Sequence, residues 1–101
     1  MKMLMHARMP HKEFNAALRD GTAEKKMKRI LEETKPEAVY FTEWKGQRSA
    51  LMIVNLDSPS QVPALSEPWF LGFNADVEFH IVMTPDDLAH AGLDALGKKW
   101  S

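Results

Sequence analysis

The sequence predicts an α+β fold, a single domain over residues 1–101 built on one antiparallel sheet. Runs of alternating apolar and polar residues, which are typical of strands, occupy four segments, at residues 3–9, 38–44, 47–55 and 76–83. Longer segments between them have apolar residues at helical spacing. Lys45 and Gly46 separate the second and third strands by two residues, which predicts a hairpin and therefore an antiparallel sheet.

The N-terminal third predicts one strand followed by two helices. Pro10 ends the strand at 3–9 and can stand in the first turn of a helix. Apolar stripes over 11–20 and 23–34 fall on different helix faces, and Asp20-Gly21-Thr22 lies between them. Gly21 can close the first helix and Thr22 can cap the second. We therefore expect a kinked helix or two short helices, the alternative being one unbroken helix with a wide buried face.

The middle of the chain predicts a hairpin and then a short helix. Gly46 supplies the positive φ that the turn between 38–44 and 47–55 requires. The segment Asp57-Ser58-Pro59 reads as a capped helix start. Pro63 and Pro68 are expected to keep this helix short, with one further turn over 67–71. Its expected anchors in the core are aromatic: Trp69, Phe70 and Phe73.

The C-terminal segment predicts a last strand, 76–83, and a last helix. Thr84 is the expected cap of that helix, Pro85 its first residue and Asp87 the acid that suits its positive end. Gly97 is expected to end it. Four apolar residues could dock it onto the domain: Leu88, Ala91, Ala95 and Leu96.

This element order, βαββαβα, is that of a ferredoxin-like split βαβ sheet with helices on one face, followed by an extra C-terminal helix. Strand alternation then divides the side chains between the two faces. The face expected under the helices carries Met3, Met5, Ala7, Met9, Val39, Phe41, Ala50, Met52, Val54, Val77, Phe79, Ile81 and Met83, with a Glu43–Arg48 pair near the turn. The free face is expected to carry Leu4, His6, Arg8, Tyr40, Thr42, Trp44, Ser49, Leu51, Ile53, Asn55, Glu78 and His80.

Composition argues against several classes of function. The net charge of −1 gives no basic field for nucleic acid or anionic membrane. The expected free faces of the two central strands also lack the aromatic residues on which RNA-recognition modules stack bases. The apolar start of the chain is interrupted by His6 and Arg8, so it reads as a strand and not as a signal peptide. With no cysteine and no apolar run of membrane length, the expectation is a cytoplasmic protein.

The element order, the mixed free face and the hairpin segment EAVYFTEWKGQRSALMIVNLDSP together resemble the dimeric α/β-barrel superfamily over residues 2–84. The chain looks most like the small bacterial members of unknown function in that superfamily. The resemblance implies a homodimer in which two ferredoxin-like subunits press their free sheet faces together. Muconolactone isomerases and cofactor-independent monooxygenases belong to the same superfamily. None of their catalytic motifs is present, so no functional residue is carried over from them.

The free face supplies the candidate site residues. His6 and His80 are candidate catalytic bases near neutral pH, and Arg8 is suited to an anionic ligand. Tyr40 and Trp44 could stack on an aromatic ligand or pack between subunits. Glu78 completes the expected ligand-binding set, which in total is His6, Arg8, Tyr40, Trp44, Glu78 and His80.

Each of these assignments has a structural alternative. Arg8 could form a salt bridge with Glu78. His6, Glu78 and His80 are metal-ligand types, but a hydrogen-bonded cluster is favoured and neither a metal nor a cofactor is expected. The resulting hypothesis is an isomerase-like or cofactor-independent monooxygenase-like protein that binds or transforms a small hydrophobic or anionic metabolite in a pocket on the free face. The alternative is a non-catalytic binding or structural homodimer.

Overall fold

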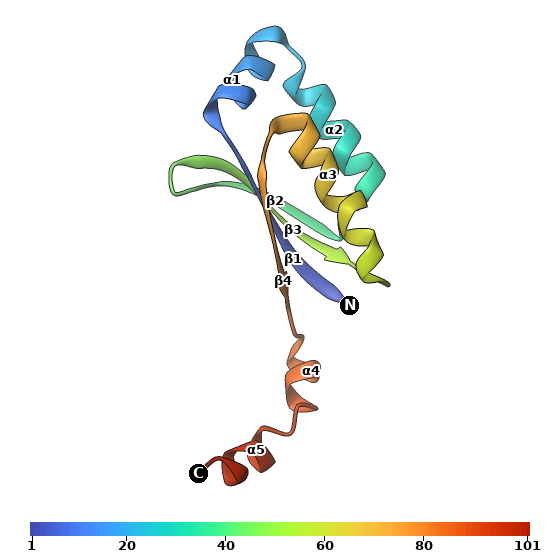
Figure 1. Ribbon diagram of the computed structural model, residues 1–101, viewed down its shortest axis with the longest axis vertical. Coiled ribbons are helices and arrows are strands. Elements are labelled where there is room, and N and C mark those ends of the chain that lie inside the picture. The colour runs from blue at the N-terminus through green and yellow to red at the C-terminus, as the bar shows by residue number, and fades with distance from the viewer.

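The computed structural model describes all 101 residues, from Met1 to Ser101. Its elements follow the expected order along the chain, with two helices at the C-terminal end instead of one (Figure 1). They are β1 (Lys2–Met9), α1 (His11–Asp20), α2 (Ala23–Thr34), β2 (Ala38–Trp44), β3 (Gln47–Asn55), the 3-10 helix η1 (Pro59–Gln61), α3 (Val62–Phe73), β4 (Asp76–Ile81), α4 (Pro85–Ala89) and α5 (Leu93–Lys99).

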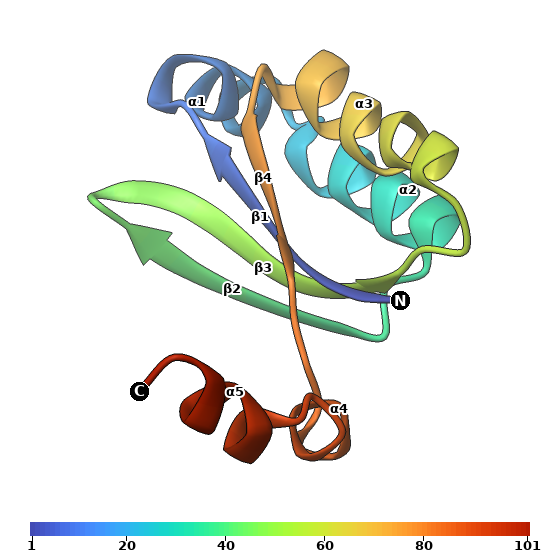
Figure 2. The ribbon, with the colours of Figure 1, turned by 60° about the horizontal axis from the view of Figure 1, so that its bottom comes forward.

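The four strands form one antiparallel sheet in the order β2-β3-β1-β4. The predicted pairing of the first and last strands as antiparallel neighbours is therefore confirmed. Helices α1, α2 and α3 lie together on one face of the sheet, and the other face carries none of them (Figure 2). The α+β architecture with one antiparallel sheet is as predicted and is compatible with a ferredoxin-like fold. No helix combines the length and the apolar character needed to cross a membrane.

The core lies between the sheet and these three helices. Strands β1 and β3 are central, so their apolar sides are fully covered, by Ala17, Ala23 and Ile30 from α1 and α2 and by α3. The buried apolar residues of the two strands are those predicted: Met3, Met5, Ala7, Met9, Ala50, Met52 and Val54. The edge strands are less well covered, and three residues predicted to be core are exposed, namely Phe41, Ile81 and Met83.

The two predicted chain reversals are formed. Gly21 adopts φ 79° at the end of α1, so two separate helices form and the prediction of a break is confirmed. Thr22 stands at the start of α2, but its hydroxyl donates to Asp20 and does not cap the helix. Lys45 and Gly46 have φ of 52° and 81°. Both values are positive, as a type I′ hairpin turn requires.

The prediction of a short third helix is wrong. Helix α3 runs through Pro68 to Phe73, following a capping box at Ser58 and Gln61. A proline inside a helix removes one hydrogen bond. The helix continues because Trp69 and Phe73, one turn apart, are both almost fully buried. Phe70 points away from them and is 40% exposed, so it is not the anchor that was expected.

The C-terminal segment differs most from its prediction. Strand β4 ends at Ile81, and Thr84 caps α4 with the expected capping box. Gly92, at φ 73°, then breaks the helix, while Gly97 lies inside α5. Residues 85–101, here called the C-terminal arm, are all exposed. The prediction that Leu88, Ala91, Ala95 and Leu96 dock the helix onto the domain is therefore wrong, and the arm stands apart from the body (Figure 1).

Candidate functional site

Strands β1 and β4 bring four of the six candidate residues together. His6 lies directly opposite Glu78, and the neighbouring pairs are Leu4–His80 and Arg8–Asp76. Because side chains alternate along a strand, these residues share the face that carries no helices. We call His6, Arg8, Glu78 and His80 the polar cluster. It lies on the free face of the sheet, as the alternation predicted.

His6 is buried although no helix covers it. Its side chain is 6% exposed, and the ring of Trp44 lies edge-on to it with the ring centroids 5.1 Å apart. Trp44 is on β2, two strands away, so its indole reaches across β3 to contact His6. Ser49, which lies on β3 opposite Arg8, is also buried. The Trp44 side chain thus shelters a small polar area on an otherwise open face.

Two polar atoms in this area have no partner. The Nε2 atom of His6 and the Nε atom of Arg8 are both buried and make no hydrogen bond within the chain. Buried polar atoms are nearly always paired, since leaving one unpaired costs about 1–3 kcal/mol. Both atoms therefore retain hydrogen-bonding capacity for a group that the chain itself does not provide.

The salt bridge considered between Arg8 and Glu78 is not formed. The strand register places Arg8 opposite Asp76 on one side and Ser49 on the other, while Glu78 faces His6. Arg8 instead donates from Nη2 to the side-chain oxygen of Gln47, at 3.4 Å. The cluster therefore keeps an arginine with no carboxylate partner.

Glu78 pairs with His80, and both side chains are exposed. Their Oε2 and Nε2 atoms are 3.3 Å apart, and each side chain is more than half exposed. An exposed pair of this kind contributes little to stability. No three His, Cys, Asp or Glu side chains in the chain are grouped so that they could hold a metal ion.

Burial lowers the pKa of His6 below its ordinary value of 6.5. Among the nearby charges, Glu78 acts to raise this pKa, while Arg8 and His80 act to lower it. Loss of solvation therefore dominates over the attraction of the carboxylate. At neutral pH His6 is a neutral imidazole, the form that can accept a proton.

Tyr40 is not part of this group. It lies in the same row as His6, but with Leu51 of β3 between them, and it is 69% exposed. Two residues that were not predicted as site residues belong to the site instead. Gln47 accepts a hydrogen bond from Arg8, and Ser49 is buried opposite Arg8. The hairpin register could have identified both, since a two-residue turn places Gln47 opposite Trp44 and Thr42 opposite Ser49.

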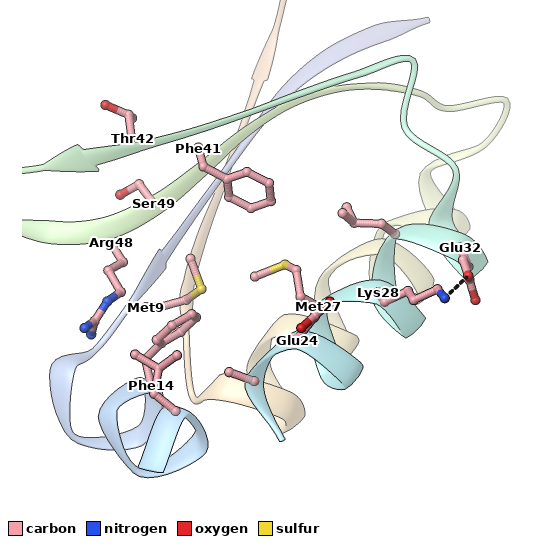
Figure 3. Close-up of a pocket in the computed structure, with 13 residues that line it drawn as sticks. Met9, Phe14, Glu24, Met27, Lys28, Glu32, Phe41, Thr42, Arg48 and Ser49 are labelled. Atoms are coloured by element: carbon pink, nitrogen blue, oxygen red, sulfur yellow. Dashed lines mark ion pairs between the residues drawn. The ribbon is translucent and has the colours of Figure 1, made fainter. Parts of the chain in front are cut away.

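None of the three main pockets of the chain is lined by a candidate residue. The most voluminous, of about 770 Å³, lies on the helix side of the sheet between α2 and the hairpin (Figure 3). In Figure 3 Phe41 and Met27 point into this groove, whereas Thr42 and Ser49 point away from it toward the free face. These three pockets therefore lie away from the polar cluster.

No protein-family model matches the chain, and no curated protein matches it significantly. The assignment of a function therefore rests on the geometry of the site.

Proposed function

We propose that the free face of the sheet binds a small anionic, partly aromatic metabolite, with His6 and Arg8 as the central residues. The observation that carries the proposal is the pair of buried, unpartnered nitrogen atoms on one face of β1, His6 Nε2 and Arg8 Nε, with the ring of Trp44 against His6. Polar groups that converge beside an aromatic surface are typical of small-molecule sites. A bound ligand would provide the hydrogen bonds that the chain lacks.

The chemistry of these groups fits a proton transfer. A neutral histidine can take a proton from an acidic C–H or O–H group. The resulting anion would be stabilised by the Arg8 guanidinium, which has no carboxylate to neutralise it. Removal of such a proton is a first step that isomerase-like and cofactor-independent monooxygenase-like reactions can share. His80 is the second candidate base, although its exposure and its contact with Glu78 favour it less.

We further propose that a second copy of the chain encloses the site. The free face exposes Tyr40 and Trp44 beside the half-buried Leu51 and Ile53, a patch of the kind that marks interfaces. Two ferredoxin-like subunits that pack these faces together would form a dimeric α/β barrel and bury the polar cluster between them. A cytoplasmic location fits a chain without cysteine.

The second candidate function is a non-catalytic structural homodimer. It is favoured by the same apolar patch, because Tyr40 and Trp44 could serve subunit packing alone. The two candidates differ in whether the polar cluster binds anything inside the dimer.

Benzoate is a suitable probe, since it combines a carboxylate with an aromatic ring. We expect NMR titration to shift the Trp44 indole and His6 ring signals, and Arg8→Ala to weaken binding at least tenfold while the protein stays folded. Arg19→Ala, which removes an exposed charge from α1, is the matched control and should bind as the parent protein does. Unchanged binding by Arg8→Ala would refute the ligand site. A dimer that does not bind benzoate or any other aromatic acid would favour the structural alternative.

A further inference from the structure

The C-terminal arm carries an apolar stripe that nothing in the chain covers. Leu93 and Leu96 of α5 and Trp100, which directly follows the helix, are spaced i, i+3 and i+7, and all are exposed. Gly97 falls on the same stripe, where the absence of a side chain permits close approach. Isolated helices shorter than about 12 residues are marginal in water. The seven-residue α5 therefore needs a surface to pack against, and its spacing is that of a helix anchored in a groove.

The arm is also far from the body of its own chain. The radius of gyration is 17.0 Å, against about 13 Å for a compact chain of 100 residues. Figure 2 shows α4 and α5 on the side of the sheet opposite to α1, α2 and α3. The arm leaves the sheet from β4, which is one of the two edge strands.

The groove on the helix side has the matching properties. Its apolar lining includes Leu18 and Phe41, which are 52% and 57% exposed, together with Met27 and Leu31 (Figure 3). Phe41 lies on β2, the other edge strand of the sheet. To reach this groove, α5 of the same chain would have to cross the whole sheet and pass to its other face. A second copy can present the groove without such a rearrangement.

The charges on the two surfaces are complementary. At about 100° per residue, Asp94 and Lys99 fall on opposite flanks of the apolar stripe of α5. The groove has a basic wall at Arg48 and an acidic residue, Glu24, on the α2 wall (Figure 3). Lys28 and Glu32 on that wall pair with each other at 3.9 Å, whereas Glu24 makes no ion pair. A docked α5 would therefore place Lys99 toward Glu24 and Asp94 toward Arg48.

We propose that α5 of each copy docks in the groove between α2 and the hairpin of a second copy of this chain. The proposal rests on the homodimer proposed above and names a further contact in it. Packing the two free faces together can bring the β4 edge of one copy near the β2 edge of the other, because closing a sheet pairs its open edges. Each arm then continues from β4 around that edge to the groove. The contact is reciprocal, as two-fold symmetry requires.

Disulfide cross-linking tests this contact cleanly, because the chain has no cysteine. Leu96→Cys on α5 and Leu18→Cys in the groove both replace exposed residues, so both variants should fold. Mixing the two proteins under mild oxidation should give a disulfide-linked dimer of one copy of each. Leu71→Cys, an exposed position on α3 outside this groove, is the matched control and should not cross-link with Leu96→Cys. Equal cross-linking to both partners, or to neither, would overturn the proposal.

Charge reversal gives an independent measurement in the dimer. Glu24→Lys and Lys99→Glu should each raise the dissociation constant several-fold, and the double variant should recover most of the loss. Additive losses in the double variant would contradict the pairing.

Sedimentation of the parent chain separates the proposed homodimer from the proposed arm contact. A dimer without cross-linking between Leu96→Cys and Leu18→Cys would remove the arm contact alone, whereas a monomer would remove the homodimer as well.

Discussion

The two faces of the sheet come from the same four strands but bury their residues by different means. On the helix-covered face, burial is provided by three helices and removes only apolar side chains of β1 and β3 from water. On the free face, one indole, that of Trp44, lies against a histidine that is almost fully buried. The helices cover mainly apolar side chains, and Nε1 of Trp69 is the one side-chain polar atom buried there without a partner. The free face leaves two such atoms, Nε2 of His6 and Nε of Arg8, on adjacent polar side chains of one strand. The second arrangement is the one expected of a binding site.

The largest effect is expected on the covered face, from Trp69→Ala. Trp69 has no exposed surface and packs against Phe73, with the ring centroids 6.2 Å apart. Truncating a buried tryptophan typically lowers the free energy of unfolding by about 3–5 kcal/mol. Leu71→Ala is the control on the same helix, since Leu71 is exposed. Urea denaturation should show a large loss for the first variant only, and a loss below about 1 kcal/mol for Trp69→Ala would break the comparison.

The hairpin that carries Trp44 gives the next largest effect. Gly46 adopts φ 81°, which a β-branched residue rarely accepts. Gly46→Val should therefore lower the free energy of unfolding by about 1–3 kcal/mol. Lys25→Ala in α2 is the control, because Lys25 is exposed and lies outside the hairpin. An unchanged melting temperature for Gly46→Val would contradict the turn.

The cover over His6 can be removed with Trp44→Ala. Burial is the main cause of the lowered pKa of His6, so exposing the ring should raise that pKa toward 6.5. Thr42→Ala truncates an exposed side chain on the same strand and face without a contact to His6, and it should leave the pKa unchanged. NMR titration of the His6 ring protons measures both variants. The same His6 pKa in Trp44→Ala as in the parent would show that another group shelters the ring.

The smallest effect is a dependence of stability on pH. Because the pKa of His6 is lowered in the folded chain, the unfolded chain binds a proton first as the pH falls below about 6.5. The free energy of unfolding should therefore decrease between pH 7.5 and pH 5, above the range in which carboxylates titrate. His6→Gln should reduce this slope, while His80→Gln, at an exposed position, should keep it. Equal slopes in all three proteins would remove the role assigned to burial.

Local patterns predicted most of the fold. The two-residue turn gave the hairpin with the correct strand bounds, and alternation placed His6, Arg8, Glu78 and His80 on the free face. The prediction that Pro68 shortens the third helix was wrong because the burial of Trp69 and Phe73, a tertiary effect, outweighs one lost hydrogen bond. The C-terminal arm was predicted to dock on its own domain, and it does not, because an apolar stripe shows that a helix needs a partner but not which surface that partner offers.

The site was predicted less completely than the fold. Strand alternation identifies a face but not the direction in which a long side chain turns within it. Arg8 could reach toward β4 or β3, and only the three-dimensional arrangement shows its contact with Gln47. The contact of Trp44 with His6 spans two strands, so it depends on the twist of the sheet and on the rotamer of Trp44.

The central claim is that the free face is incomplete in one chain and is closed by a second copy. Sedimentation velocity of the purified parent chain at micromolar concentration tests this claim directly. We expect a species of twice the 11.5 kDa mass of one chain, and we expect Tyr40→Glu on the free face to shift it toward monomer. A parent chain that sediments as a monomer, with the same coefficient as Tyr40→Glu, would contradict it.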